Sequence, residues 1–121
     1  MKILLSAEGP SPSDRVDPRF GRAPYLIAYD SSDESFVALD NSGQVQAAQG
    51  AGIRTAQRAV EAGPDVVLTG HCGPKAFAVL EEAGVKVYSD VTGTVIEAVH
   101  AWREGDAAPL AAPDSRGHRR P

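Results

Sequence analysis

The residues with the clearest capacity for chemistry are His71 and Cys72, which stand side by side in a short turn-like segment. Imidazole and thiolate are both ligands for iron and zinc, and a thiolate is also a nucleophile. Pro74 favours the first turn of a helix, so Cys72 would lie at a helix N-terminus, where the helix dipole favours the thiolate. We therefore predict metal ligation by Cys72 and His71. The alternatives are a cysteine packed beneath the turn and a solvated loop histidine.

The number of cysteines limits what such a site can be. Cys72 is the only cysteine among the 121 residues, so no internal disulfide can form. One thiolate cannot supply a standing zinc or iron–sulfur site, which needs several. A preformed cluster brings its own sulfides, so one or two protein donors within a positively charged cradle could hold it transiently. This pattern favours a carrier over an enzyme with a resident metal.

A second candidate segment carries the arginines Arg19 and Arg22. A guanidinium group offers a planar fork of donors, which suits an anionic cluster or its organic acid. The alternative for Arg22 is a salt bridge within the chain that holds the loop in place. Between them, Phe20 is expected to anchor the loop in the core, and Gly21 to adopt a backbone shape that other residues do not accept.

Hydrophobic patterning up to residue 105 predicts the element order β-β-β-α-β-α-β-α. The first three strands should form an antiparallel meander, and the last two should enter through helical crossovers, which gives a mixed sheet of order 3-2-1-4-5. Residues 106–121 lack periodicity and are expected to form a disordered tail, so we predict one domain over 1–105. The strands are expected near 2–6, 25–29, 36–39, 65–69 and 85–88, and the helices near 53–62, 74–83 and 94–104.

This topology would gather the candidate segments at one edge of the sheet. The loop after the first strand, segment 41–52, the turn 70–74 and segment 89–92 all fall there, and all three helices begin there. A helix N-terminus presents unpaired N–H groups and a partial positive charge, so the edge would favour an anion. Any α/β domain concentrates loops in this way, so the gathering alone does not identify a ligand.

Residues 17–25, Asp-Pro-Arg-Phe-Gly-Arg-Ala-Pro-Tyr, resemble the dinitrogenase iron–molybdenum cofactor biosynthesis family, the NifX-like domain also found at the end of some NifB proteins. The similarity continues in order through Asn41, 50–53 with Ala56, 67–70, 73–77 and 84–88, and it covers about residues 1–105. It implies a ribonuclease H-like three-layer α/β fold with a mixed five-stranded sheet. It also implies binding of the iron–molybdenum cofactor or its iron–sulfur precursors, with cluster-assembly proteins as partners. Many relatives stand alone in organisms without nitrogenase, so the cargo stays open.

Taken together, the residue chemistry and the resemblance define the predicted site. His71 and Cys72 are the predicted metal ligands. The residues predicted to bind the cluster are Arg19, Phe20, Gly21, Arg22, Asn41, Gly70 and Gly73.

Bulk properties exclude several other classes of function. The formal net charge of −4 and the pI near 5.3 give no general attraction to nucleic acid. No apolar run approaches the roughly 20 residues of a membrane span. The apolar run at residues 3–5 is too short for a signal peptide, so we expect a cytoplasmic protein.

Three other functions stay open. A nuclease of this fold would need several carboxylates on central strands, yet the predicted first strand has no Asp or Glu. A thiol enzyme would need a general base in reach of Cys72, and the adjacent His71 need not point the right way. A regulatory or protein-interaction module without a cluster fits every pattern above. The sequence does not determine the oligomeric state.

Overall fold

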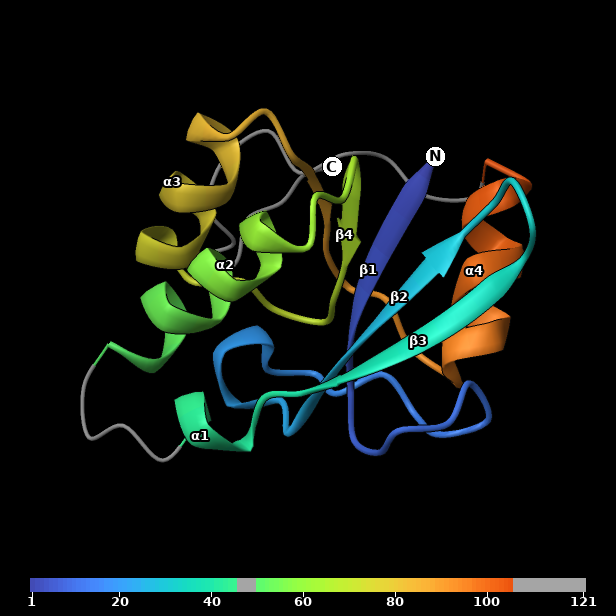
Figure 1. Ribbon diagram of the computed structural model, residues 1–121, viewed down its shortest axis with the longest axis horizontal. Coiled ribbons are helices and arrows are strands. Elements are labelled where there is room, and N and C mark those ends of the chain that lie inside the picture. Colours follow the sequence, from blue (N-terminus) through green and yellow to red (C-terminus); the bar gives the residue numbers. More distant parts are fainter. Residues whose placement is uncertain (46–49, 106–121) are drawn as a thin grey trace.

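A five-stranded mixed sheet forms the centre of the fold (Figure 1). The computed structural model describes residues 1–45 and 50–105. The strands are β1 (Lys2–Ala7), β2 (Tyr25–Asp30), β3 (Ser35–Asp40), β4 (Val66–Leu68) and β5 (Lys86–Tyr88). Their spatial order is β3-β2-β1-β4-β5, which confirms the predicted order. The β1–β2 and β2–β3 pairs are antiparallel, and the β1–β4 and β4–β5 pairs are parallel.

The central strand β1 is buried on both of its faces. Ile3, Leu4 and Leu5 have no exposed surface. Successive residues of a strand point to opposite faces, and Leu4 lies in register with Ala28 of β2 and Val67 of β4. A strand that is apolar in both directions requires a layer of helices on each side of the sheet.

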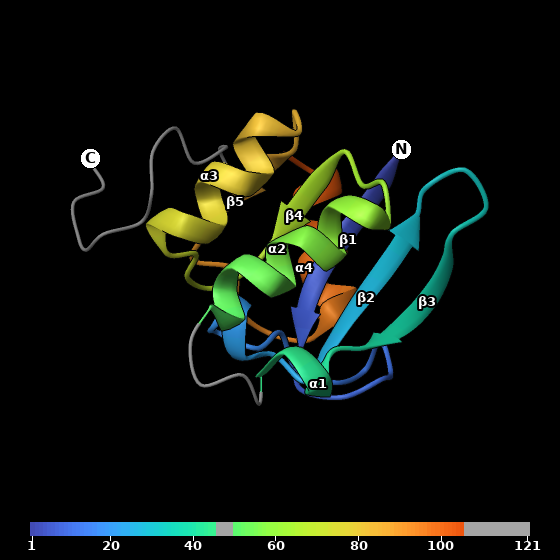
Figure 2. The ribbon, with the colours of Figure 1, turned by 60° about the vertical axis from the view of Figure 1, so that its left-hand side comes forward.

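Three helices supply these two layers (Figure 2). The helices α2 (Ala51–Glu61) and α3 (Pro74–Glu82) pack on one face, and α4 (Val95–Arg103) packs on the other. Gly63 and Gly84 follow α2 and α3 with φ of 72° and 81°, a left-handed conformation that commonly ends helices. The predicted α/β class with three layers is therefore confirmed.

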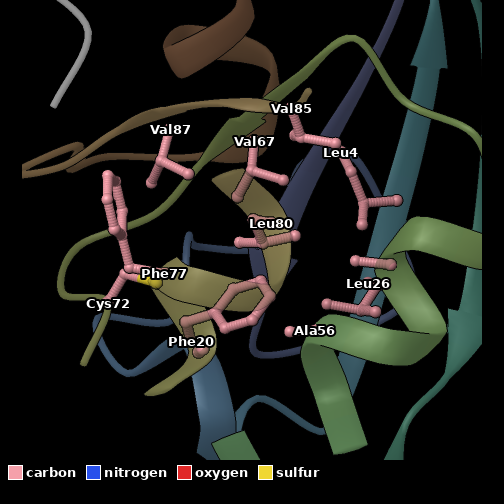
Figure 3. Close-up of a cluster of buried hydrophobic side chains, with 12 residues drawn as sticks. Leu4, Phe20, Leu26, Ala56, Val67, Cys72, Phe77, Leu80, Val85 and Val87 are labelled. Atoms are coloured by element: carbon pink, nitrogen blue, oxygen red, sulfur yellow. The ribbon is translucent and has the colours of Figure 1, made fainter. Parts of the chain in front are cut away.

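Each helical layer covers its own apolar cluster. The cluster beneath α2 and α3 packs Phe20, Cys72, Phe77 and Leu80 together with Leu4 of the sheet (Figure 3). A second cluster lies beneath α4 on the opposite face. The loop that contains Phe20 thus belongs to the same face as α2 and α3.

Two short elements were not predicted. They are the 3-10 helix η1 (Phe20–Arg22) and the helix α1 (Ser42–Val45), each about one turn long, which is too short to produce a helical period in the sequence. The helix α2 begins at Ala51, slightly before the apolar pattern that predicted it. The predicted tail at 106–121 lies outside the described residues. None of the helices that the structure describes has the length and apolarity needed to cross a bilayer.

Candidate functional site

The arginine-bearing loop after β1 and the His71 turn after β4 lie against each other. The backbones of Arg19 and His71 form an isolated parallel β-bridge, and the Phe20 N–H donates to the His71 carbonyl oxygen at 3.1 Å. β1 and β4 are parallel neighbours, so their carboxyl ends reach the same edge of the sheet, the lower edge in Figure 1. The prediction that these two segments share one edge is confirmed. We call this region, formed by loop 17–22, turn 69–73 and the first turns of α2 and α3, the cradle.

Two glycines of the cradle allow neighbouring backbone segments to approach closely. A Cβ atom on Gly70 would lie 2.6 Å from the Cα of Pro18, and one on Gly21 would lie 2.8 Å from the Cα of Gly52. The backbone of Gly21 has no positive φ, so the prediction of an unusual backbone shape there is wrong. Glycine is required at this position because η1 sits directly against the start of α2.

Two helix N-termini open onto the cradle. α2 is preceded by Gly50 and α3 by Gly73, and neither glycine can provide a side-chain cap. The first intrahelical bonds are donated by the N–H groups of Arg54 and Phe77, which leaves the preceding N–H groups without an intrahelical partner. The dipoles of both helices direct positive charge to this point.

The third helix does not contribute, which corrects the expectation that three N-termini surround one crevice. α4 lies on the opposite face of the sheet. Thr94 caps it, since the Thr94 hydroxyl accepts from the Glu97 N–H and the Glu97 carboxylate accepts from the Thr94 N–H. The loop carbonyls of Asp14 and Pro12 accept from the next two N–H groups, at 2.9 and 3.0 Å. The N-terminus of α4 is therefore occupied by its own chain.

Basic side chains surround the cradle. Arg19 and Arg22 are exposed on the loop, His71 is exposed on the turn, and Lys75 is exposed in the first turn of α3. An acidic residue, Asp90, also reaches this edge, where its N–H donates to the Gly70 carbonyl at 2.8 Å. The exposed charge on the loop, the turn and the first turn of α3 is positive, as an anionic ligand requires.

Three of the predicted site residues are buried beneath this surface. Phe20, Asn41 and Cys72 are 1%, 0% and 0% exposed, respectively. Phe20 anchors its loop in the core, as predicted. The sulfur of Cys72 lies within the apolar cluster drawn in Figure 3, so it could reach a ligand only if the turn moved. Metal ligation by Cys72 stays a prediction.

Asn41 forms hydrogen bonds to two segments that lie beside the cradle. Its Nδ2 donates to the Ala23 carbonyl at 2.9 Å and to the Thr55 hydroxyl at 3.0 Å, which ties the start of β2 to α2. Its Oδ1 has no hydrogen-bond partner among the described residues. Direct contact between Asn41 and a cluster also stays a prediction.

The donor set of the cradle is one that binds anions. Within residues 1–45 and 50–105, no three His, Cys, Asp or Glu side chains come together as ligands for a metal ion. The groups that the cradle does present, guanidinium, ammonium and backbone N–H, bind anions through charge and hydrogen bonds.

Comparison with known proteins identifies the family. The model for the dinitrogenase iron–molybdenum cofactor family matches residues 1–105. The chain belongs to this family. Family membership relates it to the biosynthesis and binding of the iron–molybdenum cofactor.

Similar proteins extend over almost the whole chain. The apo form of the orange protein from Desulfovibrio gigas is 40% identical, with a TM-score of 0.91 over 94% of this chain and 96% of that one. A NifB-like protein from Thermotoga is 33% identical, with a TM-score of 0.82 over 96% and 98% of the two chains. A protein from Methanocaldococcus jannaschii is 25% identical over 108 residues, 87% of each chain. The chain therefore shares the fold of these proteins over nearly its whole length.

Sequence reasoning missed two polar residues under the cradle of this family member, Ser6 and Thr69. Both are fully buried, and their hydroxyl oxygens lie 2.8 Å apart. The available signal was a hydroxyl residue near the end of each of two apolar strands that were predicted to be neighbours.

Proposed function

We propose that this chain binds an anionic iron–sulfur or iron–molybdenum cluster on the cradle and carries it, without covalent chemistry of its own. The observation that carries the proposal is the direct pairing of Arg19 with His71 in a member of this family. That pairing brings the arginine loop to the two uncapped helix N-termini. Positive charge from side chains and from backbone is thereby concentrated at one edge.

The electrostatics of the cradle favour a negatively charged cargo. Each helix N-terminus is equivalent to about half a positive charge. Arg19 and Arg22 add guanidinium groups that can donate two parallel hydrogen bonds to one anionic group. These contacts are exposed and reversible, as a carrier that must release its cargo requires.

Direct coordination would be limited in this arrangement. His71 is exposed and can offer an imidazole nitrogen to iron. Cys72 would add a thiolate only after the turn moved. Because a preformed cluster already contains bridging sulfides, such a small donor set is sufficient for transient binding.

One relative supports a bound state. The orange protein, 40% identical to this chain, is described in its apo form, a term that implies a ligand-bound form of that protein. Cluster-assembly proteins in the cytoplasm would be the donor and the acceptor of the cargo. A regulatory or interaction module of the same fold without a cluster is the alternative, and cluster uptake separates the two.

The test is anaerobic loading of the purified chain. The protein is mixed with iron(II) and sulfide, or with isolated cofactor precursor, and the visible spectrum and metal content are recorded after desalting. Uptake of about one cluster per chain is expected for the wild type. No uptake from either source would refute the proposal.

Two charge variants locate the binding surface. Arg22→Gln should weaken the cluster Kd about tenfold, the effect of losing one charge-assisted hydrogen bond at an exposed site. Lys86→Gln removes the same charge from the start of β5, at the opposite edge of the sheet, and should leave Kd unchanged. Equal Kd values for the two variants would show that the cluster does not bind at the cradle.

A second pair of variants tests direct coordination. His71→Ala should change the visible spectrum of the loaded protein if the imidazole binds iron, and Cys72→Ala should do so only if the turn opens. A spectrum identical to that of the wild type in both variants would leave charge and backbone N–H groups as the whole of the binding site.

A further inference from the structure

A buried chain of hydrogen bonds lies directly beneath the cradle. The Ser6 hydroxyl donates to the Asp17 carbonyl at 2.8 Å, and the Ser6 and Thr69 hydroxyl oxygens are also 2.8 Å apart. A serine hydroxyl has a single proton, and here that proton is directed at Asp17. Thr69 must therefore donate to Ser6. The chain runs from Thr69 through Ser6 to the backbone of the loop.

The orientation of this pair follows from the strand register. Leu4 and Val67 belong to the cluster under α2 and α3, and alternate residues of a strand share a face. Ser6 and Thr69, two residues further along, therefore point to the same face, where the loop and the turn lie. Neither hydroxyl is needed to pair the strands, because backbone hydrogen bonds already join β1 to β4.

Further hydrogen bonds hold Asp17, the loop residue at one end of this series of hydrogen bonds. The Asp17 N–H donates to the Ser6 carbonyl at 2.9 Å, and its carboxylate accepts from the Arg19 N–H at 2.9 Å. The backbone of Thr69 is also attached, since its N–H donates to Tyr88 and its carbonyl accepts from Val91. The Thr69–Ser6–Asp17 chain thus links a fixed strand end to the residue that orients Arg19.

We infer that Ser6 and Thr69 are positioning residues that set the spacing between the arginine loop and the His71 turn. Buried hydroxyls are costly unless they are hydrogen-bonded, and here their bonds reach the loop rather than other parts of the core. Loss of the Thr69 hydroxyl would remove the hydrogen bond that the Ser6 oxygen accepts, and would uncouple the turn after β4 from the Ser6–Asp17 bond that holds the loop. The consequence for cargo binding rests on the proposed function, whereas the effect on the loop does not.

Three variants separate positioning from general stability. Thr69→Val has nearly the same shape and lacks the hydroxyl, while Thr69→Ser keeps the hydroxyl. Ile27→Val removes a methyl group from the cluster under α4, on the other face of the sheet, and serves as a destabilised control.

The first measurement uses the protein without cargo. Amide hydrogen exchange at Phe20 reports the bond from its N–H to the His71 carbonyl. Thr69→Val should increase this exchange rate about tenfold relative to amides of the α4 face, as expected for one lost hydrogen bond. Thr69→Ser and Ile27→Val should show no such selective increase. A Phe20 rate in Thr69→Val equal to that of the wild type, after correction for global stability, would overturn the inference.

The second measurement compares cluster binding, with iron(II) and sulfide as the probe. Thr69→Val should weaken Kd about tenfold, with Thr69→Ser and Ile27→Val close to the wild type. Faster Phe20 exchange together with an unchanged Kd would overturn the role in cargo binding. If the wild type takes up no cluster, the proposed function fails, and the exchange measurement still decides whether Ser6 and Thr69 position the loop.

Discussion

A methyl group at position 70 has no room in this fold. A Cβ there would lie 2.6 Å from the Pro18 Cα and 2.7 Å from the Pro18 carbonyl oxygen, both backbone atoms that cannot rotate away. Ordinary contact begins at 3.4 Å, so Gly70→Ala requires the turn and the loop to separate by about 0.8 Å, the difference between 3.4 and 2.6 Å. The bond from the Phe20 N–H to the His71 carbonyl is already 3.1 Å long and would be lost at such a separation.

The expected cost of Gly70→Ala follows from this crowding. Overpacking of this kind typically lowers the free energy of unfolding by about 1–3 kcal/mol. For a domain of this size, that corresponds to a decrease in Tm of roughly 5–15 °C. Thermal unfolding followed by circular dichroism measures this decrease, and cluster loading should fall with it because the loop and turn no longer meet.

Gly73→Ala is the matched control in the same turn. Apart from the two neighbouring residues, no part of the described chain lies within 4 Å of a Cβ placed there, and the φ of −69° suits any residue. Its stability should equal or exceed that of the wild type, by up to about 1 kcal/mol, because alanine restricts the unfolded chain. The added methyl group would lie at the N-terminus of α3, so cluster affinity should fall. A Tm for Gly70→Ala within about 1 °C of the Gly73→Ala value would refute the reasoning.

Three further outcomes are expected. Cys72→Ser places a hydroxyl in an apolar cluster and should lower the free energy of unfolding in urea by about 1–3 kcal/mol; an unchanged value would contradict the burial of this side chain. Thr94→Ala removes the cap of α4 and should cost about 1 kcal/mol in the same assay, whereas Thr94→Ser should restore it. The hydroxyl and the N–H of Ser42 hold the pKa of Asp40 below its ordinary value. The stabilisation from this interaction is therefore present above the ordinary aspartate pKa and is lost as the pH falls through the lowered value. In Ser42→Ala the Asp40 pKa should move up toward the ordinary value in an NMR titration, and a pKa that stays unchanged would contradict the assigned cause.

Much of the fold could be predicted because its signals are local. The apolar run at 66–68 between Gly63-Pro64 and a glycine-rich turn indicated a buried parallel strand, and β4 occupies that position. The expected helical crossovers gave the strand order 3-2-1-4-5, in which β4 lies beside β1, and this order brought Arg19 and His71 to the same edge. Short elements such as η1 escaped prediction because a single turn produces no period.

The candidate site was predicted less completely, since direction and burial depend on distant segments. Cys72 was correctly placed before a helix, but the sequence does not show that its side chain points into the core. Gly21 was recognised as unusual, but the reason, contact with Gly52, joins residues that are 31 positions apart in the numbering.

By itself, the sequence determined the types of element, their order in the sheet and the edge at which the candidate residues gather. Periodicity and turn residues act over a few neighbouring residues, and the alternation of strands and helices that they define restricts how the strands can be arranged. Only the tertiary structure decided which of those residues reach the surface. It separated α4 from the cradle, buried Phe20 and Cys72, and joined Ser6 to Thr69. These outcomes depend on distances between strands and loops that pack together from far apart in the chain, and no local pattern encodes such distances.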